Sequence, residues 1–240
     1  MPFTFSHPAV VLPFLDNKKI SASALIVGTV SPDLWYFFTM GLAGGISHTL
    51  LGVFVVDLPL SILTLFLFHL IVKKALLQNS PFFIQSRTQQ LQHFDWIKYF
   101  KMNYVTVILS IIFGALTHLG LDSLTHCDGY FVMNFEFYSS IFLGIPFFVY
   151  VHLIFSIIGL ILIFNYFFKL PVSKQKIYEV KKSYWIWSVI VATIVFFLKH
   201  PFELPTDKNG IQTLLVVLFS SFNIGLISVS LIFKNKSSIS

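Results

Sequence analysis

Five long runs of apolar residues divide the chain, and shorter polar stretches separate them. Four of the runs exceed the roughly 20 residues that a helix needs to cross the hydrocarbon core of a bilayer, and one reaches the lower limit of about 17. Backbone groups in lipid must be hydrogen-bonded within their own segment, so such runs form helices. The pattern predicts transmembrane helices at about 49–72, 103–124, 141–168, 184–200 and 211–233.

A sixth segment, residues 20–38, is less apolar and is interrupted by Pro32 and Asp33. We predict a sixth crossing here, which makes about six membrane helices. The preceding stretch, residues 7–16, is too short to cross and predicts an N-terminal half-helix. It either packs against the sixth segment and brings His7 toward Asp33, or lies flat on the inner leaflet. The residue pattern leaves both placements open.

Lysine and arginine orient the predicted helices. The loops 73–102 and 169–183 hold five basic residues each, whereas the loops 39–48 and 125–140 hold none. Loops rich in lysine and arginine stay on the cytoplasmic side of a membrane. We therefore expect the two basic loops and the C-terminus to be cytoplasmic. The two loops without lysine or arginine should face outward.

The basic loop 73–102 carries apolar residues at three- to four-residue spacing, which is typical of a helix lying on the membrane surface. These residues are Leu91, Phe94, Ile97, Phe100 and Tyr104. No internal repeat or linker divides the chain. We expect an all-α polytopic transmembrane helical bundle that forms one domain over residues 1–240, with a His- and Asp-bearing part at about 1–132 and an apolar helical part at about 141–233.

Composition agrees with a protein solvated by lipid. Hydrophobic residues make up 56% of the chain and charged residues 11%, with a mean hydropathy of +0.81. A soluble domain carries roughly a quarter charged residues. The net charge of +6 does not indicate nucleic acid as a partner, because the basic residues mark cytoplasmic loops. A single cysteine, Cys127, excludes an intrachain disulfide and a CxxC zinc site.

Polar residues gather at the outer end of one predicted helix. The stretch GALTHLGLDSLTHCDGY, residues 114–130, carries His118, Asp122 and His126 at four-residue spacing. Positions four apart on a helix share one face, so these side chains form a stripe. The predicted topology brings three more residues to the same side and a similar depth: Asp33, His48 and Asp57. Such polar residues at membrane depth need a compensating partner.

A divalent metal ion would supply that compensation. Imidazole and carboxylate groups are the ligands expected for zinc, manganese or non-haem iron, and the absence of thiolates argues against a purely structural zinc site. The alternative is hydrogen bonding between helices. Three histidines and three aspartates together favour metal. Three residues outside the cluster could support the ligands, although helix packing, capping or loop exposure also explains them: His69, Glu136 and His152.

Four stretches carry a resemblance to a known family. MPFTFSHPA, GTVSPDLWYF, SHTLLGVFVVDLPL…LFH and HLGLDSLTHCDGYFV resemble the bacterial membrane proteins called domain of unknown function 4184, over residues 1 to about 132. That family has no established activity, and its pattern is similar to membrane-bound metal-dependent hydrolases. The similarity implies a set of metal ligands and two neighbours, Asp57 and His126; the ligands are His7, Asp33, His48, His118 and Asp122. It also includes His69, within LFH.

Three functions follow for a multi-pass protein of the bacterial inner membrane. The first is a metal-dependent hydrolase, with zinc before manganese or iron, that acts on a lipid-linked phosphate or ester at the outer face. Asp57 or Asp122 would then be the catalytic carboxylate, with Asp33 as a further choice. The second is a proton- or ion-coupled transporter or relay. The third is a structural membrane protein without catalysis. We rank them in this order, with membrane lipid or a lipid-linked substrate as the expected partner.

Overall fold

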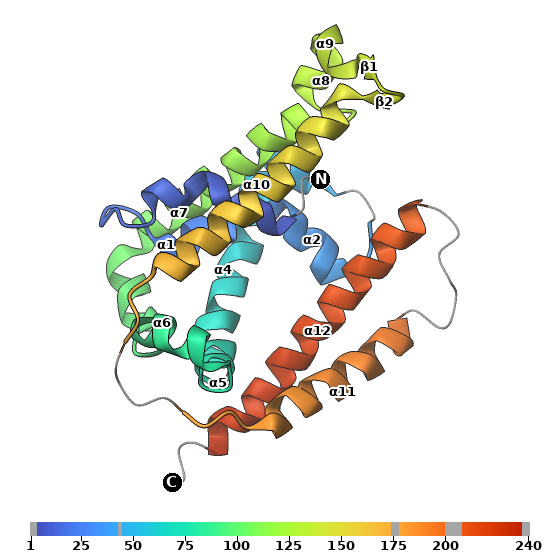
Figure 1. Cartoon of the computed structure of the whole chain (residues 1–240). Helices are drawn as coiled ribbons and strands as arrows, with labels where there is room; N and C mark the ends of the chain where they lie inside the picture. Colours follow the sequence, from blue (N-terminus) through green and yellow to red (C-terminus); the bar gives the residue numbers. More distant parts are fainter. Residues whose placement is uncertain (1–3, 43–44, 174–177, 200–207, 237–240) are drawn as a thin grey trace. The chain divides into compact units, whose positions relative to one another are not determined.

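The computed structural model describes residues 4–42, 45–173, 178–199 and 208–236 (Figure 1). Its contacts divide the chain into two compact units, each made of segments that are distant in sequence. The first unit comprises Met1–Trp35, Gly45–Ile62 and Met102–Leu170, and the second comprises Tyr36–Gly44, Leu63–Lys101 and Pro171–Ser240. The assignment of the whole chain to one membrane domain stays a prediction.

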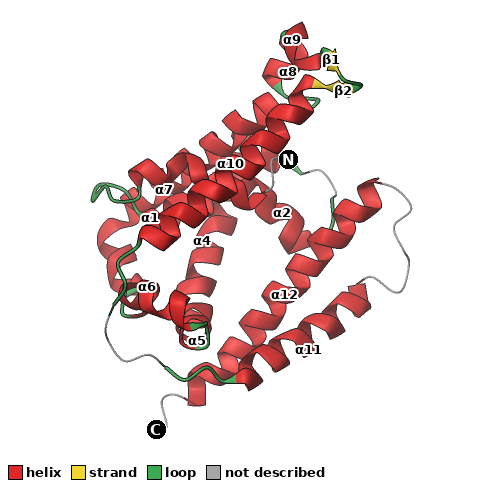
Figure 2. Cartoon of the chain, viewed as in Figure 1, coloured by secondary structure: helices red, strands yellow, loops and turns green. Residues whose placement is uncertain are grey.

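Five helical stretches are long and apolar enough to cross a membrane. They are Leu50–Gln78, Trp96–Asn134, Phe147–Lys169, Lys182–Lys199 and Gly210–Phe233. Each contains most of one predicted apolar run, so the prediction of an all-α helical bundle is confirmed. Within the described residues, the strands are limited to β1 (Ile141–Phe142) and β2 (Ile145–Pro146), an antiparallel pair (Figure 2).

The stretch Leu50–Gln78 is not a uniform α-helix. Two π-helical turns, η3 (Val53–Asp57) and η4 (Phe68–Val72), interrupt it. The α-helical parts are α3 (Leu50–Gly52), α4 (Leu58–Leu67) and α5 (Lys73–Gln78). π-Helical turns are rare in proteins, and those that occur are often found at functional sites. Each of the two turns holds a buried ionisable side chain, Asp57 in η3 and His69 in η4.

The first unit also contains most of α7 (Trp96–Thr125), from Met102 onward, and the backbone of this helix leaves helical geometry at Asn103. Two short helices, α8 (Tyr130–Asn134) and α9 (Glu136–Ser139), precede the β-hairpin, and α10 (Phe147–Lys169) follows it. The short helix η2 (Ile46–His48) leads into α3.

The N-terminal segment is a 3₁₀-helix, η1 (Thr4–Phe14), that contains Pro8 and Pro13. Each proline lacks a backbone N–H, so a regular α-helix could not keep its hydrogen bonds here. The segment packs against α10, where a Cβ on Gly159 would lie 2.9 Å from the Cβ of Ser6. His7 is buried at 1% exposure, as the packed placement of residues 7–16 requires and the flat placement does not.

The sixth predicted crossing is not one helix. Residues 20–38 form two short helices, α1 (Ala22–Gly28) and α2 (Ser31–Thr39). Pro32 lies in the first turn of α2, and a proline disfavours helical geometry at the residue before it and removes a hydrogen-bond donor. The chain therefore turns between the two helices, and the five longer stretches are the candidates for crossing a membrane.

The predicted surface helix combines parts of two elements. In the structure, α6 (Phe82–Gln92) ends before Asp95, and α7 begins at Trp96. Asp95 caps α7, because its Oδ1 accepts a hydrogen bond from the backbone N–H of Lys98 at 3.0 Å. The prediction of one helix through all five apolar positions is wrong, since the first position lies in α6, the second lies between the helices, and the last three lie in α7.

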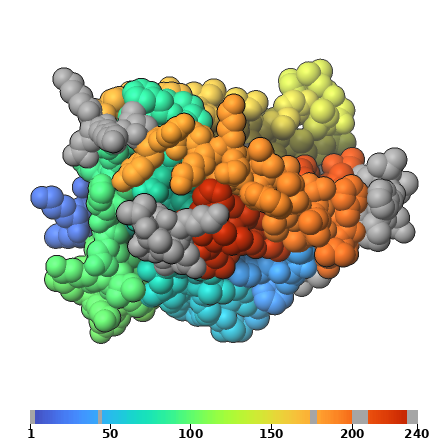
Figure 3. Space-filling model, turned by 90° about the horizontal axis from the view of Figure 1, so that it is seen from below, coloured from blue at the N-terminus to red at the C-terminus, as the bar shows by residue number. Residues whose placement is uncertain are grey.

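The second unit contains a close pair of helices, α11 (Lys182–Lys199) and α12 (Lys208–Lys236), which lie side by side (Figures 1 and 3). A Cβ on Gly225 would lie 2.4 Å from the carbonyl oxygen of Ser188, so glycine permits this approach. The hydroxyls of Tyr184 and Ser230 are hydrogen-bonded at 3.0 Å inside the pair.

Candidate metal centre

Five predicted ligands converge inside the first unit from four separate elements. η1 supplies His7, α2 supplies Asp33, η2 supplies His48, and α7 supplies both His118 and Asp122. They form two overlapping groups that share His118, and within each group the ligand atoms lie within 4.8 Å of one another. One group is His7, His118 and Asp122; the other is Asp33, His48 and His118.

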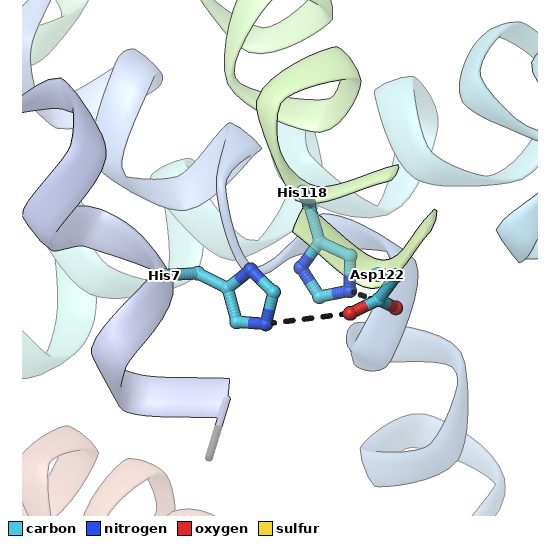
Figure 4. A group of neighbouring side chains, drawn as sticks. All are labelled: His7, His118 and Asp122. Atoms are coloured by element: carbon cyan, nitrogen blue, oxygen red, sulfur yellow. Dashed lines mark ion pairs between the residues drawn. The ribbon is translucent and has the colours of Figure 1, made fainter. Parts of the chain in front are cut away.

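The first group is compact and buried. Figure 4 shows the side chains of His7, His118 and Asp122 directed toward one another. The Nε2 atom of His118 lies 3.2 Å from Oδ2 of Asp122, and Nε2 of His7 lies 3.7 Å from Oδ1 of the same carboxylate. The two imidazole rings stack at a centroid distance of 3.8 Å and an angle of 12°. Both rings therefore present an Nε2 atom to one carboxylate.

The second group is joined to the first through Asp122. Nε2 of His48 lies 3.3 Å from Oδ1 of Asp33 and 3.7 Å from Oδ2 of Asp122. Nε2 of His118 lies 3.9 Å from the same Asp33 oxygen. Three imidazoles and two carboxylates are thus connected through contacts of 3.2–3.9 Å, and this donor set suits zinc, manganese or iron.

A close helix crossing positions His118. Gly28 on α1 meets Gly114 on α7: a Cβ on Gly114 would lie 2.5 Å from the carbonyl oxygen of Leu25 and 2.7 Å from the nitrogen of Thr29. The crossing brings the carbonyl oxygen of Thr29 to 2.8 Å from Nδ1 of His118. A carbonyl only accepts hydrogen bonds, so Nδ1 donates the proton and Nε2 keeps its lone pair for the cluster.

Two further contacts orient the second group, and sequence reasoning missed both. The hydroxyl of Thr4 donates to Oδ2 of Asp33 at 2.6 Å, and the hydroxyl of Ser47 lies 3.3 Å from Nδ1 of His48. Thr4 lies three residues before His7, which places both on one face of a 3₁₀-helix. That spacing is the one sequence signal that could have indicated Thr4.

Several buried atoms of the cluster have no hydrogen-bond partner among the described residues. They are Nδ1 and Nε2 of His7, Oδ1 of Asp33, Nε2 of His118, and both carboxylate oxygens of Asp122. Leaving a buried polar atom unsatisfied costs about 1–3 kcal/mol, and more for a charged group. Orphaned nitrogen and oxygen atoms that face one another fit a bound cation, because such an ion is a ligand for all of them at once.

The protonation states outside the membrane-spanning stretches suit metal binding. Burial lowers the pKa of His7 from 6.5 to about 3, so its imidazole is neutral near pH 7. Burial alone would raise the pKa of Asp33, but the close contact with the His48 imidazole and the hydrogen bond from Thr4 hold the pKa below the usual value. A neutral imidazole and an ionised carboxylate are the forms that coordinate metals.

His126 and Asp57 lie near the cluster without joining either group. Nδ1 of His126 lies 3.5 Å from Oδ1 of Asp122, but it also lies 3.2 Å from the backbone carbonyl oxygen of Asp122. That carbonyl can only accept, so this nitrogen donates to it. Asp57 is completely buried, and both of its oxygens lack a hydrogen-bond partner in the described part of the chain. The roles of both residues stay predictions.

The three supporting candidates have different surroundings. The ring of His152 on α10 lies 6.5 Å from that of His126, edge to face. Glu136 is exposed on α9. His69 belongs to the second unit, where its ring stacks on Trp96 at 4.5 Å. Only His152 therefore has a ring contact with a residue beside the cluster.

The fold and the site together define a class: helical membrane proteins with several candidate crossings and a buried histidine–aspartate cluster that could hold a metal ion. Within that class, the family model described as domain of unknown function (DUF4184) matches residues 1–233, so the chain belongs to this family. The match extends through the apolar C-terminal helices, beyond the first 132 residues on which the resemblance rested. No curated protein and no solved structure matches the chain.

Proposed function

We propose that the protein is a membrane-embedded, metal-dependent hydrolase that acts on a lipid-linked phosphate or ester. One observation carries the proposal: five His and Asp residues from four elements converge, and most of their inward atoms are buried without hydrogen-bond partners. The histidine nitrogens and aspartate oxygens approach one another to 3.2–3.9 Å without forming hydrogen bonds, whereas a cluster that only locked helices together would complete those bonds.

The residues that would hold the ion are the five of the two groups, with His126 at the edge. Zinc is the first choice, and manganese and iron suit the same donors. When bound, such an ion would act as a Lewis acid toward a phosphoryl or acyl oxygen and activate water for attack. Bound ions of this kind need ligands held in fixed orientations, which the contacts of Thr29, Thr4 and Ser47 provide.

The exposure of the side chains indicates how a substrate would reach the site. The side chains of His7 and His118 are completely enclosed, whereas His48 is 26% exposed and His126 is 25% exposed. The open edge therefore lies at His48 and His126. Two apolar residues beside His48, Ile46 and Leu50, are exposed at 43% and 68%. An apolar border of this kind favours a substrate with a lipid tail that approaches from within the bilayer.

The carboxylates have separable roles in this proposal. Both oxygens of Asp122 lie within 3.7 Å of ligand nitrogens, so this residue would hold the ion and its ligands in place. Asp57 lies in the same unit but outside the two ligand groups, and its carboxylate has no hydrogen-bond partner among the described residues. It is the better candidate for a base that accepts a proton from water.

A transporter or proton relay is the second candidate, and one observation favours it. Ser61 follows Asp57 by one helical turn, both are completely buried, and the Ser61 hydroxyl also has no hydrogen-bond partner in the described chain. A polar carboxylate and hydroxyl in succession along a membrane helix are what a proton path uses.

The test compares the two functions on purified protein. A hydrolase should contain about one or two divalent ions, cleave a lipid-linked phosphate or ester in detergent without any gradient, and lose activity with a chelator. His118→Ala with Asp122→Ala should remove both metal and activity. His93→Ala, at an exposed position, is the matched control.

A transporter would behave differently in the same material. It would move protons or ions in sealed vesicles, and that flux would survive chelation. Gradient-dependent flux with wild-type metal content in the double variant would contradict the hydrolase proposal and favour the relay.

A further inference from the structure

A second group of buried polar side chains lies in the second unit, outside the candidate metal centre. It is formed by His69 of η4, Lys73 at the start of α5, and Trp96 at the start of α7, with Phe94 between the helices. His69 and Lys73 lie near the end of the Leu50–Gln78 stretch, and Phe94 and Trp96 lie where the lysine- and arginine-bearing loop leads into the next stretch.

The geometry of this group is well defined. The ring of His69 stacks on the indole of Trp96 at 4.5 Å and 4°, and its centroid lies 5.6 Å from the ring of Phe94. Lys73 follows His69 by four residues, so both side chains leave the same helical face. The ammonium of Lys73 donates to the carbonyl oxygen of Phe94 at 2.6 Å and lies 5.6 Å from that ring.

These side chains are buried and their donors are unused. His69 is 6% exposed, Lys73 4% and Trp96 2%. Both ring nitrogens of His69 and the indole nitrogen of Trp96 have no hydrogen-bond partner among the residues that the structure describes. The Lys73 ammonium has three hydrogens, and its contact with Phe94 uses one.

No described carboxylate pairs with the buried ammonium. The ion pairs of the described chain all join histidine and aspartate in the first unit. Asp95, the residue after Phe94, caps α7 by accepting from the backbone N–H of Lys98. A buried charge without a counter-ion is strongly unfavourable. Asp95 attracts the Lys73 ammonium electrostatically but forms no ion pair with it. The group therefore combines a positive charge with unused N–H donors, and no carboxylate of the described residues contacts the ammonium directly.

We propose that His69, Lys73 and Trp96 form a binding site for a phosphate group. A phosphate has several acceptor oxygens in a tetrahedral arrangement, so it can accept from an ammonium, an indole N–H and an imidazole N–H together. The aromatic rings of Phe94 and Trp96 suit the boundary between headgroups and acyl chains, where tryptophan is enriched. Basic pockets on the lysine-rich side of membrane proteins bind lipid headgroups.

This site does not depend on the proposed hydrolase. Its residues belong to the second unit, whereas the five metal-ligand candidates belong to the first. The phosphate could come from an anionic phospholipid or from free inorganic phosphate, because both present the same oxygens to the three donors.

The test uses full-length protein that has been stripped of lipid in an uncharged detergent. Thermal unfolding is followed in separate titrations with inorganic phosphate, phosphatidylglycerol and diacylglycerol. We expect phosphatidylglycerol or inorganic phosphate to raise the unfolding temperature, and diacylglycerol to have a smaller effect. Stabilisation by phosphatidylglycerol alone identifies a lipid headgroup, and stabilisation by inorganic phosphate as well identifies a free-anion site.

Variants then connect the effect to the three donors. Trp96→Phe keeps the stacked ring but removes the N–H, and Lys73→Met keeps the chain length but removes the charge. Each should weaken the apparent affinity by about ten- to a hundredfold, as expected when a hydrogen bond to a charged group is lost. Trp187→Phe and Lys74→Met, at exposed positions of the same unit, are the matched controls.

The proposal is overturned if neither phosphate compound stabilises the wild-type protein, or if diacylglycerol does so equally. It is also overturned if Trp96→Phe retains wild-type affinity for the stabilising compound. Because Trp96→Phe preserves the ring contact with His69, this variant remains informative even if Lys73→Met does not fold.

Discussion

The side chain of His7 is completely enclosed, both of its ring nitrogens lack a hydrogen bond among the described residues, and it comes from a segment that contains two prolines. A buried histidine normally satisfies at least one nitrogen through a hydrogen bond. The packing of its ring on His118 at 3.8 Å cannot replace that bond. At the scale of single residues, the cation proposed for this site would supply the partner that the ring lacks.

The variant His7→Ala should therefore weaken metal retention by about 10–100-fold, as expected for loss of a ligand or of its close support. Competition with a chelator of known affinity, followed by metal analysis, measures this change. His93→Ala should leave retention unchanged, since that residue is exposed and lies in the second unit. Wild-type affinity in His7→Ala would exclude this ring from the site.

The sequence indicated the candidate metal ligands better than the groups that hydrogen-bond to those ligands. Spacing of four on one helix was enough to join His118 and Asp122, and their atoms lie 3.2 Å apart. His118 is oriented by the backbone carbonyl of Thr29. Every residue has a backbone carbonyl, so the amino-acid type at position 29 does not reveal this contact. His126 shares the predicted stripe, yet its Nδ1 turns to the carbonyl of Asp122, which spacing alone cannot reveal.

At the scale of elements, the crossing of α1 and α7 is the contact that depends most on glycine. Gly114→Ala should lower metal affinity several-fold and destabilise the protein by about 1–3 kcal/mol, because the new methyl group would force α1 and the Thr29 carbonyl away from His118. Thermal unfolding and metal competition on the same sample measure the two effects.

Gly120 on the same helix provides the control. A Cβ at this position meets nothing within 4 Å, so Gly120→Ala should preserve metal affinity and raise stability by up to about 1 kcal/mol through helix propensity. Equal behaviour of the two variants would mean that the α1–α7 crossing does not position the site.

Element prediction succeeded where hydrophobic length decides the outcome. All five long runs became helices because a lipid-soluble backbone has few other solutions. Element prediction failed where single residues determine the ends of a helix. Pro32 helps to split residues 20–38 into α1 and α2, and the Asp95 cap separates α6 from α7. The 3₁₀ form of Thr4–Phe14 likewise reflects two prolines rather than hydrophobic pattern.

At the scale of the whole molecule, the orientation in the membrane can be tested through Cys127, the single and exposed cysteine. The distribution of basic residues predicts that it faces outward, so a membrane-impermeant maleimide should label it in intact cells whose outer barrier has been made permeable. Mass analysis of the purified protein measures the labelled fraction. Stripping the metal should speed the reaction by opening access beside His126.

Two further variants control this measurement. Cys127→Ser gives the background, and Lys98→Cys in that variant places a thiol in the first turn of α7, on the side of the basic residues, where labelling should require a broken membrane. Labelling of Cys127 only after breakage would reverse the topology and move the candidate metal centre to the cytoplasmic side. Charge distribution predicts orientation statistically, whereas the grouping of distant segments into two units depends on contacts that no local pattern encodes.

The contact between Ser6 and Gly159 has a consequence for the order of biosynthesis. The segment that carries His7 is made first, but α10, against which it packs, is made only after more than half of the chain has been synthesised. During that interval, the segment that carries His7 lacks the helix against which it packs in the folded protein. The candidate metal centre can therefore be completed only late in translation, and any ion that it holds should be loaded after α10 has been made.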